Sequence, residues 1–500
     1  MSALFEQAEQ SRESVAIIDS TGSHTYGELL DASASVAARL LGDADDLQQQ
    51  AVAFLVPPGF EYVAIQWGIW RAGGMAVPLG VMHPAQELAY VLDNARPTKA
   101  IAHPDFEDRL TAITNERSIP LLATASTLAA EPVEPLPTID PTRRAMMLYT
   151  SGSTGKPKGV VTTHATVLAQ VDSLVEAWRW SADDHILHVL PLHHIHGIIN
   201  VLSCAMRVGA TCEFLPAFDA TEVWNRMSAG SLSLFMAVPT IYARLIAAFD
   251  AASLQQQTKW SAGAKTLRLM VSGSAALPVP TLERWEKMTG HRLLERYGMT
   301  EIGMGLSNPY DGERRPGFVG KPLPGVEARR TNEAGEVVEG NEPGEIEIRG
   351  RTVFSEYWER PEATAESFRD GWFRTGDIAV VEDGAFRILG RNSVDIIKTG
   401  GYKVSALDIE DVVRTHPLVA DCAVVGVPDA EWGERVAVCV VGPDTSKLVL
   451  NELRAWGKER LAVYKVPSLL MCRDELPRNA MGKVQKPEIR KLFEAADNSD

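Results

Sequence analysis

A stretch rich in glycine, serine and lysine is the first candidate for chemistry in this chain. It spans residues 148–160 and reads LYTSGSTGKPKGV. Glycine leaves backbone N–H groups accessible, and hydroxyl and ammonium groups can bind and neutralise the oxygens of a polyphosphate. The ordinary P-loop pattern fails, because Pro157 follows Gly155-Lys156 where that motif requires serine or threonine. The stretch predicts a phosphate-binding loop of another kind, with a Ser/Gly-rich surface turn as the alternative.

Two further stretches carry a carboxylate that a nucleotide could use. In Tyr297–Glu301, YGMTE, an acid next to a hydroxyl could hold Mg²⁺ against a triphosphate. The alternative is a helix N-terminus capped by Thr300. The stretch Trp372–Asp377, WFRTGD, ends in an acid that could accept hydrogen bonds from both hydroxyls of a ribose. Taken alone, Asp377 is more typical of a β-turn.

Cationic side chains gather in two stretches near the C-terminus. Gly390-Arg391 opens a run that ends in IIKTGGYK at 396–403, and cations around a double glycine suit a junction that contacts anions and must bend. The stretch Pro477–Lys483, PRNAMGK, presents a lysine on a glycine-containing loop. A lone lysine in a loop is usually only solvated, so this stretch alone predicts no site.

Three histidines, His193, His194 and His196, lie within PLHHIHG at 191–197. No nearby acids or cysteines complete a metal site, and the spacing is not that of HExxH. We expect these histidines in a turn, where they form a pocket wall or a lid.

The pattern of the chain predicts an α/β framework that brings these stretches together. Five hundred residues exceed what one hydrophobic core usually holds. Strand-like and helix-like segments alternate to about residue 290, which predicts parallel sheets covered by helices on both faces. From Gly317 onwards, short β runs split by glycine and proline predict a β-barrel-like part. We expect a large N-terminal domain at residues 1–391 and a small, mobile C-terminal α/β domain at residues 392–500.

Composition narrows the class of protein. With 45% hydrophobic and 23% charged residues the chain is typical globular material, and a net charge of −16 argues against nucleic acid as a partner. We expect no secretory signal and no membrane span. Five scattered cysteines suit a reducing compartment, so the predicted location is cytoplasmic. The oligomeric state cannot be read from the sequence.

Taken together and in this order, the motifs resemble the adenylate-forming superfamily of acyl-CoA synthetases, luciferases and adenylation domains. The resemblance runs from about Tyr26 to Lys483 and rests on TSGSTGKPKG, YGMTE, RTGD, the GR-to-GGYK junction and PRNAMGK. It implies that a carboxylate attacks the α-phosphate of ATP·Mg²⁺ to give acyl-AMP and pyrophosphate. The C-terminal domain then rotates, and a thiol, usually coenzyme A, takes the acyl group.

The resemblance also implies roles for individual residues. The leaving phosphates would be held by Thr150, Ser151, Gly152, Ser153, Thr154, Gly155 and Lys158. The nucleotide would further contact Ser274, Ala275, Ala276, Tyr297, Gly298, Met299, Asp377 and Arg391. Catalysis would fall to Thr300, Glu301 as the magnesium ligand, and Lys483. The thiol channel would be formed by Lys398, Gly400 and Gly401, and the hinge would lie at Ser393 or Val394, where the segment after Gly390-Arg391 appears one residue longer than usual.

The arginine at position 296 indicates which class of acyl substrate the protein uses. Relatives usually carry a small residue before the YGMTE tyrosine, so an arginine there would block a long fatty chain and bind the distal carboxylate of a small dicarboxylic acid. The stretches LPLHHIHG, FMAVPTIYARL, SGSAALP and LLERYGMTEIGMGLSNP resemble malonyl-CoA synthetases. On that resemblance Arg244 would be a second contact, and the three histidines would line the pocket. The alternatives are an ion pair for Arg296 and a helix-surface charge for Arg244.

The leading functional hypothesis is therefore an ATP-dependent malonate or methylmalonate–CoA ligase. The first alternative is a short-chain or aryl monocarboxylate acyl-CoA ligase. The second is a catalytically inactive nucleotide-binding scaffold, against which the intact set of Thr154, Glu301, Asp377 and Lys483 argues. The expected partners are a small dicarboxylic acid, ATP and coenzyme A, with no nucleic acid and no membrane.

Overall fold

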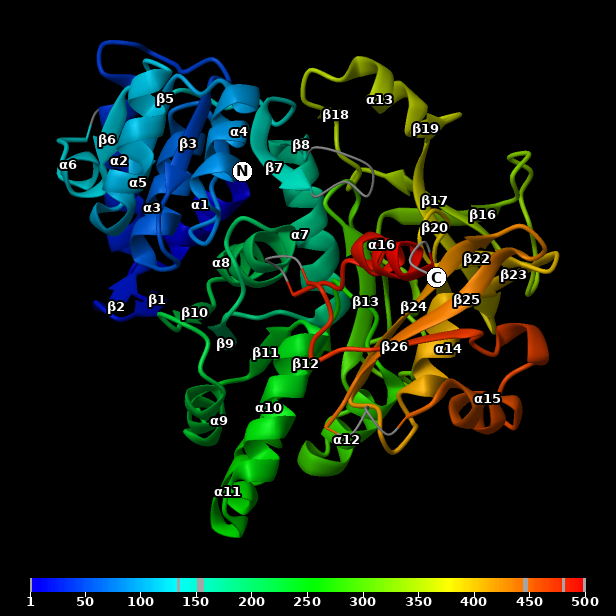
Figure 1. The fold of residues 1–500 in the computed structure, drawn as a ribbon. Helices are drawn as coiled ribbons and strands as arrows, with labels where there is room; N and C mark the ends of the chain where they lie inside the picture. The colour runs from blue at the N-terminus through cyan, green and yellow to red at the C-terminus, as the bar shows by residue number, and fades with distance from the viewer. Residues whose placement is uncertain (1, 133–134, 151–156, 444–447, 479–481, 498–500) are drawn as a thin grey trace.

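The computed structural model describes residues 2–132, 135–150, 157–443, 448–478 and 482–497. These residues form four sheets. Figure 1 shows the C-terminal strands, in orange and red, gathered on the opposite side of the molecule from the blue N-terminal helices and strands.

The first sheet is built on apolar strands. Its members are β3 (Ala51–Leu55), β4 (Met75–Pro78), β5 (Lys99–Ala102), β6 (Leu121–Ala123), β7 (Arg144–Thr150), β8 (Lys158–Thr163) and β18 (Glu356–Tyr357). The strand order is β18-β8-β7-β4-β3-β5-β6. Every residue of β3, AVAFL, is buried, as expected for a strand with helices on both faces of its sheet. β8 runs antiparallel to β7, and β18 antiparallel to β8, so this edge departs from the parallel pattern.

The second sheet holds the strands nearest the predicted motifs. Its members are β1 (Val15–Asp19), β2 (Gly22–Thr25), β9 (His185–His188), β10 (Thr211–Phe214), β11 (Leu234–Ala237), β12 (Leu269–Ser272), β13 (Leu294–Met299), β14 (Gly303–Ser307) and β15 (Lys321–Pro322). The order is β15-β14-β13-β12-β11-β9-β10-β1-β2. The strands from β1 to β13 along this order are parallel, whereas β2, β14 and β15 pair antiparallel at the edges.

The other two sheets are mainly antiparallel. The third, which is the predicted β-barrel-like part, contains β16 (Val326–Thr331), β17 (Gly344–Gly350), β19 (Phe368–Arg369), β20 (Trp372–Glu382) and β21 (Ala385–Arg391). The fourth contains β22 (Ile396–Thr399), β23 (Tyr402–Ser405), β24 (Asp421–Asp429), β25 (Gly433–Val441) and β26 (Leu469–Cys472). The change of sheet falls between β21 and β22. The division at 391/392 stays a prediction, whereas the predicted fold class, a large α/β part with a smaller C-terminal part, is confirmed.

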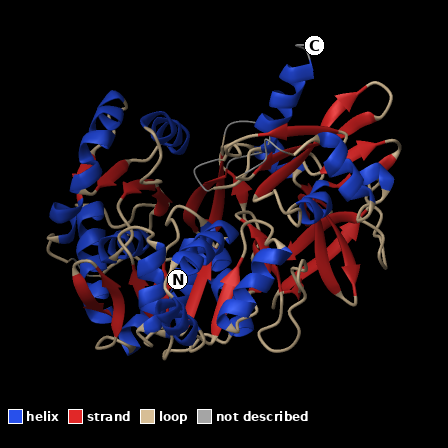
Figure 2. Cartoon of the chain, turned by 60° about the horizontal axis from the view of Figure 1, so that its bottom comes forward, coloured by secondary structure: helices blue, strands red, loops and turns tan. Residues whose placement is uncertain are grey.

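Helices cover the sheets, as Figure 2 shows for the N-terminal part. α2 begins at a capping box between Thr25 and Glu28, and α3 is buried along the whole of Tyr62–Trp70, as suits a helix packed on more than one side. The helices are α1 (Ser2–Gln10), α2 (Tyr26–Leu41), α3 (Phe60–Arg71), α4 (Ala85–Ala95), α5 (Pro104–Glu116), α6 (Thr124–Leu128), α7 (His164–Trp178), η1 (His196–Ser203), α8 (Cys204–Val208), α9 (Ala220–Ser228), α10 (Pro239–Ala251), α11 (Leu254–Ala264), α12 (Val279–Thr289), α13 (Pro361–Glu366), α14 (Ala406–Val413), α15 (Leu450–Lys458), η3 (Val463–Lys465) and α16 (Lys486–Asp497). Across the described ranges, we find no helix with the length and apolar character needed to span a bilayer.

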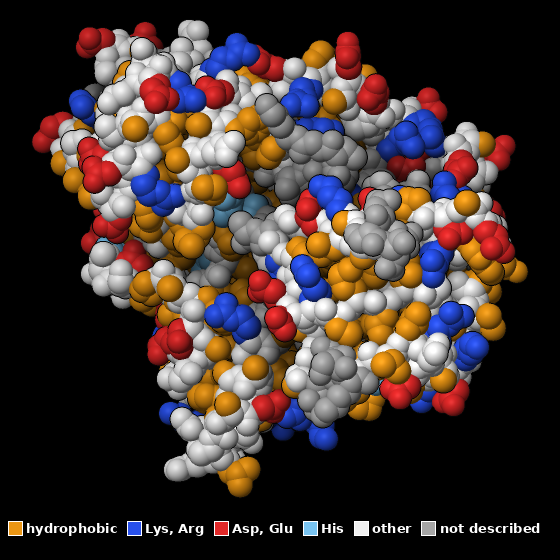
Figure 3. All heavy atoms as spheres, viewed as in Figure 1, with side chains coloured by type: hydrophobic (Ala, Val, Ile, Leu, Met, Phe, Trp, Pro, Cys, Tyr) orange, Lys and Arg blue, Asp and Glu red, His pale blue; other side chains and the backbone are white. Residues whose placement is uncertain are grey.

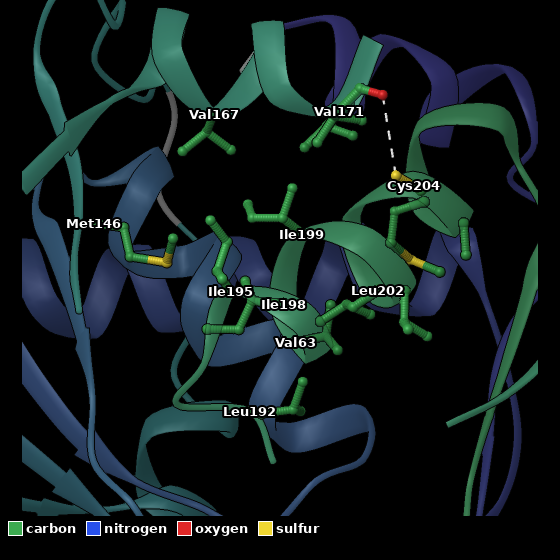
Figure 4. Close-up of a cluster of buried hydrophobic side chains, with 14 of the residues drawn as sticks. Val63, Met146, Val167, Val171, Leu192, Ile195, Ile198, Ile199, Leu202 and Cys204 are labelled. Carbon is green, nitrogen blue, oxygen red and sulfur yellow. Dashed lines mark hydrogen bonds between the residues drawn. The ribbon is translucent and has the colours of Figure 1, made fainter. Parts of the chain in front are cut away.

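The π-helix η1 anchors the histidine segment in the core. All its residues are buried, and Figure 4 shows its isoleucines among side chains that include Val63 and Val167. The thiol of Cys204, just after η1, lies 4.0 Å from the carbonyl oxygen of Val171. π-helical turns are frequent at functional sites, and this one fixes the position of His196 at its first residue.

Core packing in the second sheet can be tested at β12. Leu269 is fully buried, whereas Leu254 at the start of α11 is 82% exposed. We expect Leu269→Ala to cost about 2–5 kcal/mol of stability, because the cavity cannot collapse in a close-packed sheet. A clear drop in the melting temperature relative to wild type is the predicted readout. The matched control is Leu254→Ala, and equal melting temperatures for the two variants would contradict this placement of the core.

Candidate nucleotide and carboxylate site

The candidate site lies at the carboxyl ends of parallel strands, where open α/β sheets usually bind their ligands. The loop after β12 carries Ser274, and the adjacent strand β13 carries Arg296 and Tyr297. In the third sheet, β20 and β21 bring Asp377 and Arg391 opposite each other in register. Figure 3 shows the surface hollowed between the N-terminal part and the rest of the chain, with histidine atoms in pale blue at the base of the hollow.

Asp377 is fixed between a phenol and a guanidinium. The Tyr297 hydroxyl donates to Asp377 Oδ2 at 2.5 Å, and Arg391 Nε donates to Oδ1 at 3.1 Å. Burial opposes the charge of Arg391, but Asp377, together with Tyr297 and Glu301, outweighs burial and raises the arginine's pKa above its ordinary value. Asp377 lies inside β20, so its assignment to a β-turn is wrong. The structure thus brings three predicted nucleotide-binding residues together.

Glu301 is a buried carboxylate next to this group. It is 5% exposed, and the Tyr357 hydroxyl donates to its Oε1 at 2.9 Å. Burial raises the pKa of Glu301 above its ordinary value, while the hydrogen bond from Tyr357 and the charges of Arg391 and Lys158 oppose the rise. Thr300 lies in the turn between β13 and β14, so the helix-cap alternative is wrong.

The predicted phosphate loop starts and ends on paired strands. Thr150 at the end of β7 lies opposite Lys158 at the start of β8. The Lys158 ammonium lies 4.4 Å from the ring centroid of Tyr357, the tyrosine that binds Glu301. The described ends of the loop therefore lie beside the Glu301 carboxylate. The predicted loop residues Ser151, Gly152, Ser153, Thr154 and Gly155 lie outside the described residues.

Arg296 is buried without a carboxylate partner. It is 3% exposed, and a Cβ on Gly273 would lie 2.7 Å from its Cζ, so the guanidinium packs directly on the backbone there. One terminal nitrogen donates to Ser274 Oγ at 3.3 Å, while Nε has no partner among the described residues. Burial lowers the pKa of Arg296. The ion pair weighed as an alternative does not form within the described part of the chain.

His196 contacts the same serine hydroxyl as Arg296. Its Nδ1 lies 3.2 Å from Ser274 Oγ, so one hydroxyl connects the imidazole to Arg296. His196 is 4% exposed, and its Nε2 finds no partner among the residues described. Burial and then the charge of Arg296 place its pKa well below the ordinary value, which makes the ring neutral at pH 7. The expectation that His196 lies in a turn is wrong, because it begins η1.

The other two predicted histidines form a neutral wall. The rings of His193 and His194 lie 4.0 Å apart between centroids, and His193 packs edge-on against His83 at 4.7 Å. Burial, together with charge on His194 and His83, lowers the pKa of His193 to about 2. Burial, together with charge on Lys483 and His83, lowers the pKa of His194 to about 3. These rings therefore add polar edges to the site but no positive charge.

Lys483 reaches the site from the C-terminal part. A Cβ on Gly482 would lie 3.6 Å from Thr240 Oγ1 at the start of α10, so the lysine loop contacts the N-terminal part. Lys483 is exposed as a whole residue. Burial of its ammonium group nevertheless lowers its pKa, and the positive charges of Arg391 and Arg296 lower the pKa further. The predicted catalytic lysine thus lies within reach of the charges on both arginines.

Arg244 and the alanines lie at or beyond the rim. Arg244 is exposed on α10 with its guanidinium 4.4 Å from the ring centroid of Phe218, as the helix-surface alternative describes. Ala275 and Ala276 are exposed in the loop after β12, whereas Gly298 and Met299 continue β13. The structure therefore does not bring Arg244 to Arg296.

The predicted thiol-channel residues lie on the β22–β23 hairpin. Gly400 N–H donates to the Trp432 carbonyl at 2.9 Å, and Lys398 N–H donates to Glu434 Oε2 at 2.8 Å. Gly400 and Gly401 both have positive φ, which glycine adopts without strain. In this arrangement the hairpin packs against the end of β25.

Tyr357 and Gly273 are functional candidates that sequence reasoning missed. Tyr357 holds Glu301 and covers Lys158, yet it reaches them only because β18 pairs with β8. Gly273 provides the space that the guanidinium of Arg296 fills. The SGSAALP stretch was the one signal for Gly273, whereas no local pattern marked Tyr357.

The donor set at Glu301 fits a magnesium ion bound mainly by phosphate. No group of three or more His, Cys, Asp or Glu side chains suited to a metal occurs among the described residues. Mg²⁺ needs only one or two protein carboxylates when phosphate oxygens and water complete its shell. A single buried carboxylate beside the phosphate-loop lysine satisfies that requirement.

Glu295 stabilises the loop next to the site. It is 5% exposed, its Oε1 accepts from the N–H of Leu277 at 3.1 Å, and its Oε2 has no partner among the residues described. Burial raises the pKa of Glu295 to about 8. Its hydrogen bond fixes the loop that carries Ser274, next to the strand position of Arg296.

Comparison with known proteins gives two family matches. The profile of the AMP-binding enzyme family matches residues 4–358, and that of the AMP-binding enzyme C-terminal domain matches residues 408–483. They include Arg296, Tyr297, Glu301 and Lys483, whereas Asp377 and Arg391 lie between the two matched ranges.

Individual relatives match along nearly the whole chain. The mitochondrial malonate–CoA ligase ACSF3 of Mus musculus is 46% identical over 515 residues, covering 95% of this chain and 88% of the relative. The crystal structure of ATP-bound MatB from Rhodopseudomonas palustris superposes with a TM-score of 0.90 at 33% identity, covering 98% of both chains. A malonyl-CoA ligase with methylmalonyl-CoA and AMP bound gives 0.68 at 36% identity, covering 93% of this chain and 97% of that one.

The buried carboxyl of Glu295 makes a prediction about pH. Its folded-state pKa of about 8 lies above the value of 4.5 for an unperturbed glutamate, so its stabilising contribution is complete below the lower value and is lost as pH rises through the upper one. Glu295→Gln keeps an acceptor for Leu277 N–H and should melt higher than wild type at pH 9. The advantage should shrink by about 1.4 kcal/mol per pH unit towards pH 5. A difference that does not change with pH would contradict the assignment.

Proposed function

The chain belongs to the family of AMP-binding enzymes, and we propose that it is an ATP-dependent malonate–CoA ligase that also accepts methylmalonate. The observation that carries the proposal is the buried guanidinium of Arg296, which forms no ion pair with the described residues and whose Nε has no hydrogen-bond partner among them. The name of the Mus musculus relative and the methylmalonyl-CoA and AMP in the malonyl-CoA ligase structure support it.

Arg296 favours a dicarboxylate because its charge lacks a counter-ion. Leaving a buried charge without its partner typically costs about 3–5 kcal/mol, and the distal carboxylate of malonate would remove that cost. A guanidinium matches a carboxylate through two parallel hydrogen bonds. The unpartnered Nε2 of His196 offers a further polar contact. A monocarboxylate such as butyrate would leave Arg296 unpaired and is therefore disfavoured.

Each of these site residues has a role in the proposed adenylation step. Asp377, oriented by Tyr297 and Arg391, would accept hydrogen bonds from the ribose hydroxyls, and Lys158 would bind the leaving phosphates. The reacting carboxylate attacks the α-phosphorus, and Lys483 would stabilise the negative charge that gathers there. Magnesium held by Glu301 would neutralise phosphate charge. Magnesium dependence is part of this proposal.

Thioester formation would follow on the same acyl-adenylate. Coenzyme A would attack the acyl carbon and release AMP, after the lysine loop has withdrawn and the β22–β23 hairpin with Gly400 and Gly401 has taken its place. The double glycine, at positive φ in both residues, suits a close approach of backbone to the thiol arm. We also propose a cytoplasmic location for this chain. The Mus musculus relative is named as mitochondrial, and that word applies to the relative alone.

Substrate preference should depend on Arg296. We expect Arg296→Met to lower kcat/KM for malonate by about 10²–10³-fold, because the distal carboxylate loses its charged partner, and to leave butyrate turnover almost unchanged. The measurement is CoA-thioester formation with each acid. The matched control is Arg284→Met, since Arg284 is exposed on α12 and paired with Asp250.

Two results would contradict the dicarboxylate pocket. One is an unchanged ratio of malonate to butyrate turnover in Arg296→Met, which would favour the short-chain or aryl alternative. The other is an equal loss in Arg284→Met. Absence of malonate-dependent pyrophosphate release from wild type would favour the inactive scaffold.

Lys483 should act in adenylation alone. We expect Lys483→Ala to slow malonate-dependent pyrophosphate release by about 10²–10³-fold, the usual effect of removing one preorganised transition-state contact. Thioester formation from supplied malonyl-adenylate and coenzyme A should persist. Loss of both half-reactions to the same degree would contradict this role.

A further inference from the structure

A buried lysine three residues beyond Lys483 contacts none of the site residues described above. Lys486 opens α16 and is 8% exposed. Its ammonium contacts Asp395 Oδ1 and lies 2.7 Å from Glu410 Oε1. Burial opposes the charge of Lys486, but the two carboxylates outweigh burial and raise its pKa. A cation buried between two anions from distant parts of the chain fixes those parts relative to each other.

Asp395 joins this cluster to the nucleotide site. Its Oδ2 accepts from the N–H of Arg391 at 2.9 Å, and its own N–H donates to the Arg391 carbonyl at 2.8 Å. A Cβ on Gly390 would lie 2.3 Å from Asp395 Cβ, so the backbone packs directly on this side chain. The turn at 391–395 connects β21 to β22, and its first residue binds Asp377.

The other partners of Lys486 are equally fixed. Glu410 is 3% exposed on α14, and its Oε1 also accepts from the N–H of Val424 in β24 at 2.8 Å. The base of the lysine loop is closed just before α16, because Gln485 N–H donates to the Pro477 carbonyl at 2.8 Å. Lys486 therefore directly follows the residue that closes the loop carrying Lys483.

We propose that Asp395 and Glu410, acting through Lys486, are positioning residues that lock the turn at 391–395 to the loop carrying Lys483. The lock sets the place of the Lys483 ammonium relative to Arg391 while the acyl-adenylate forms. The bond from Arg391 N–H to Asp395 closes the turn and must break when the turn opens. This inference rests on the proposed ligase function. The lock acts only in the first half-reaction of the ligase, which is formation of the acyl-adenylate.

The test separates the two half-reactions in the full-length protein. We expect Lys486→Met to lower malonate-dependent exchange of pyrophosphate into ATP by about 10²-fold, the usual effect of a small displacement of a catalytic group. Thioester formation from supplied malonyl-adenylate and coenzyme A should change by less than about threefold. Asp395→Asn, which leaves Glu410 to bind Lys486, should show the same split in a milder form, and Lys486→Arg should restore most of the exchange.

The control is Lys491→Met, because Lys491 lies on the same helix, is exposed and pairs locally with Glu488. Exchange by wild type and by this control measures the proposed function itself, so its failure is distinguishable from failure of the lock. Equal losses in both half-reactions of Lys486→Met and Asp395→Asn would overturn the inference and assign the cluster to stability alone. Exchange by Lys486→Met at the level of the control would overturn it as well.

Discussion

A positive charge buried without an ion-pair partner among the described residues is the constraint on which this site depends. Arg296 is removed from solvent on a central strand, with the backbone of Gly273 against its guanidinium and one hydroxyl, that of Ser274, as its hydrogen-bond partner. Such a group is costly to fold and is retained where an anionic ligand completes it. Burial holds His193, His194 and His196 neutral, so these histidines add no positive charge to that of Arg296.

A second constraint of the proposed reaction is that Lys483 comes from a part of the chain that must also move away before the thioester forms. Lys483 reaches the arginines from a loop on the C-terminal sheet, and the turn after β21 connects that sheet to Asp377 through Arg391. The chain superposes better on ATP-bound MatB, with a TM-score of 0.90, than on the malonyl-CoA ligase with methylmalonyl-CoA and AMP bound, with 0.68. Its arrangement is therefore more similar to that of ATP-bound MatB than to that of the malonyl-CoA ligase product complex.

The sequence predicted the parts of this protein that are encoded locally. Alternating apolar strands and helices indicated the α/β fold, and YGMTE and RTGD placed Tyr297 and Asp377 in one site, where they share a hydrogen bond. Pairing between distant segments escaped prediction. Tyr357 binds Glu301 because β18 joins the edge of the first sheet, a contact 56 residues away along the chain.

Local context also misled some assignments. An arginine such as Arg244 could bind a carboxylate, but at the surface its guanidinium packs over the aromatic ring of Phe218 instead. The local sequence predicts a turn at His196, yet this residue is the first of a buried π-helix. Burial of these segments depends on the whole core, which no single window of sequence contains.

The most direct measurement is CoA-thioester formation by the unaltered protein with ATP and Mg²⁺ across malonate, methylmalonate, succinate, acetate, butyrate and benzoate. We expect a clear preference for malonate and methylmalonate, because only a short dicarboxylate can place one carboxylate at the α-phosphorus and the other on Arg296. Equal or faster turnover of butyrate or benzoate would contradict it.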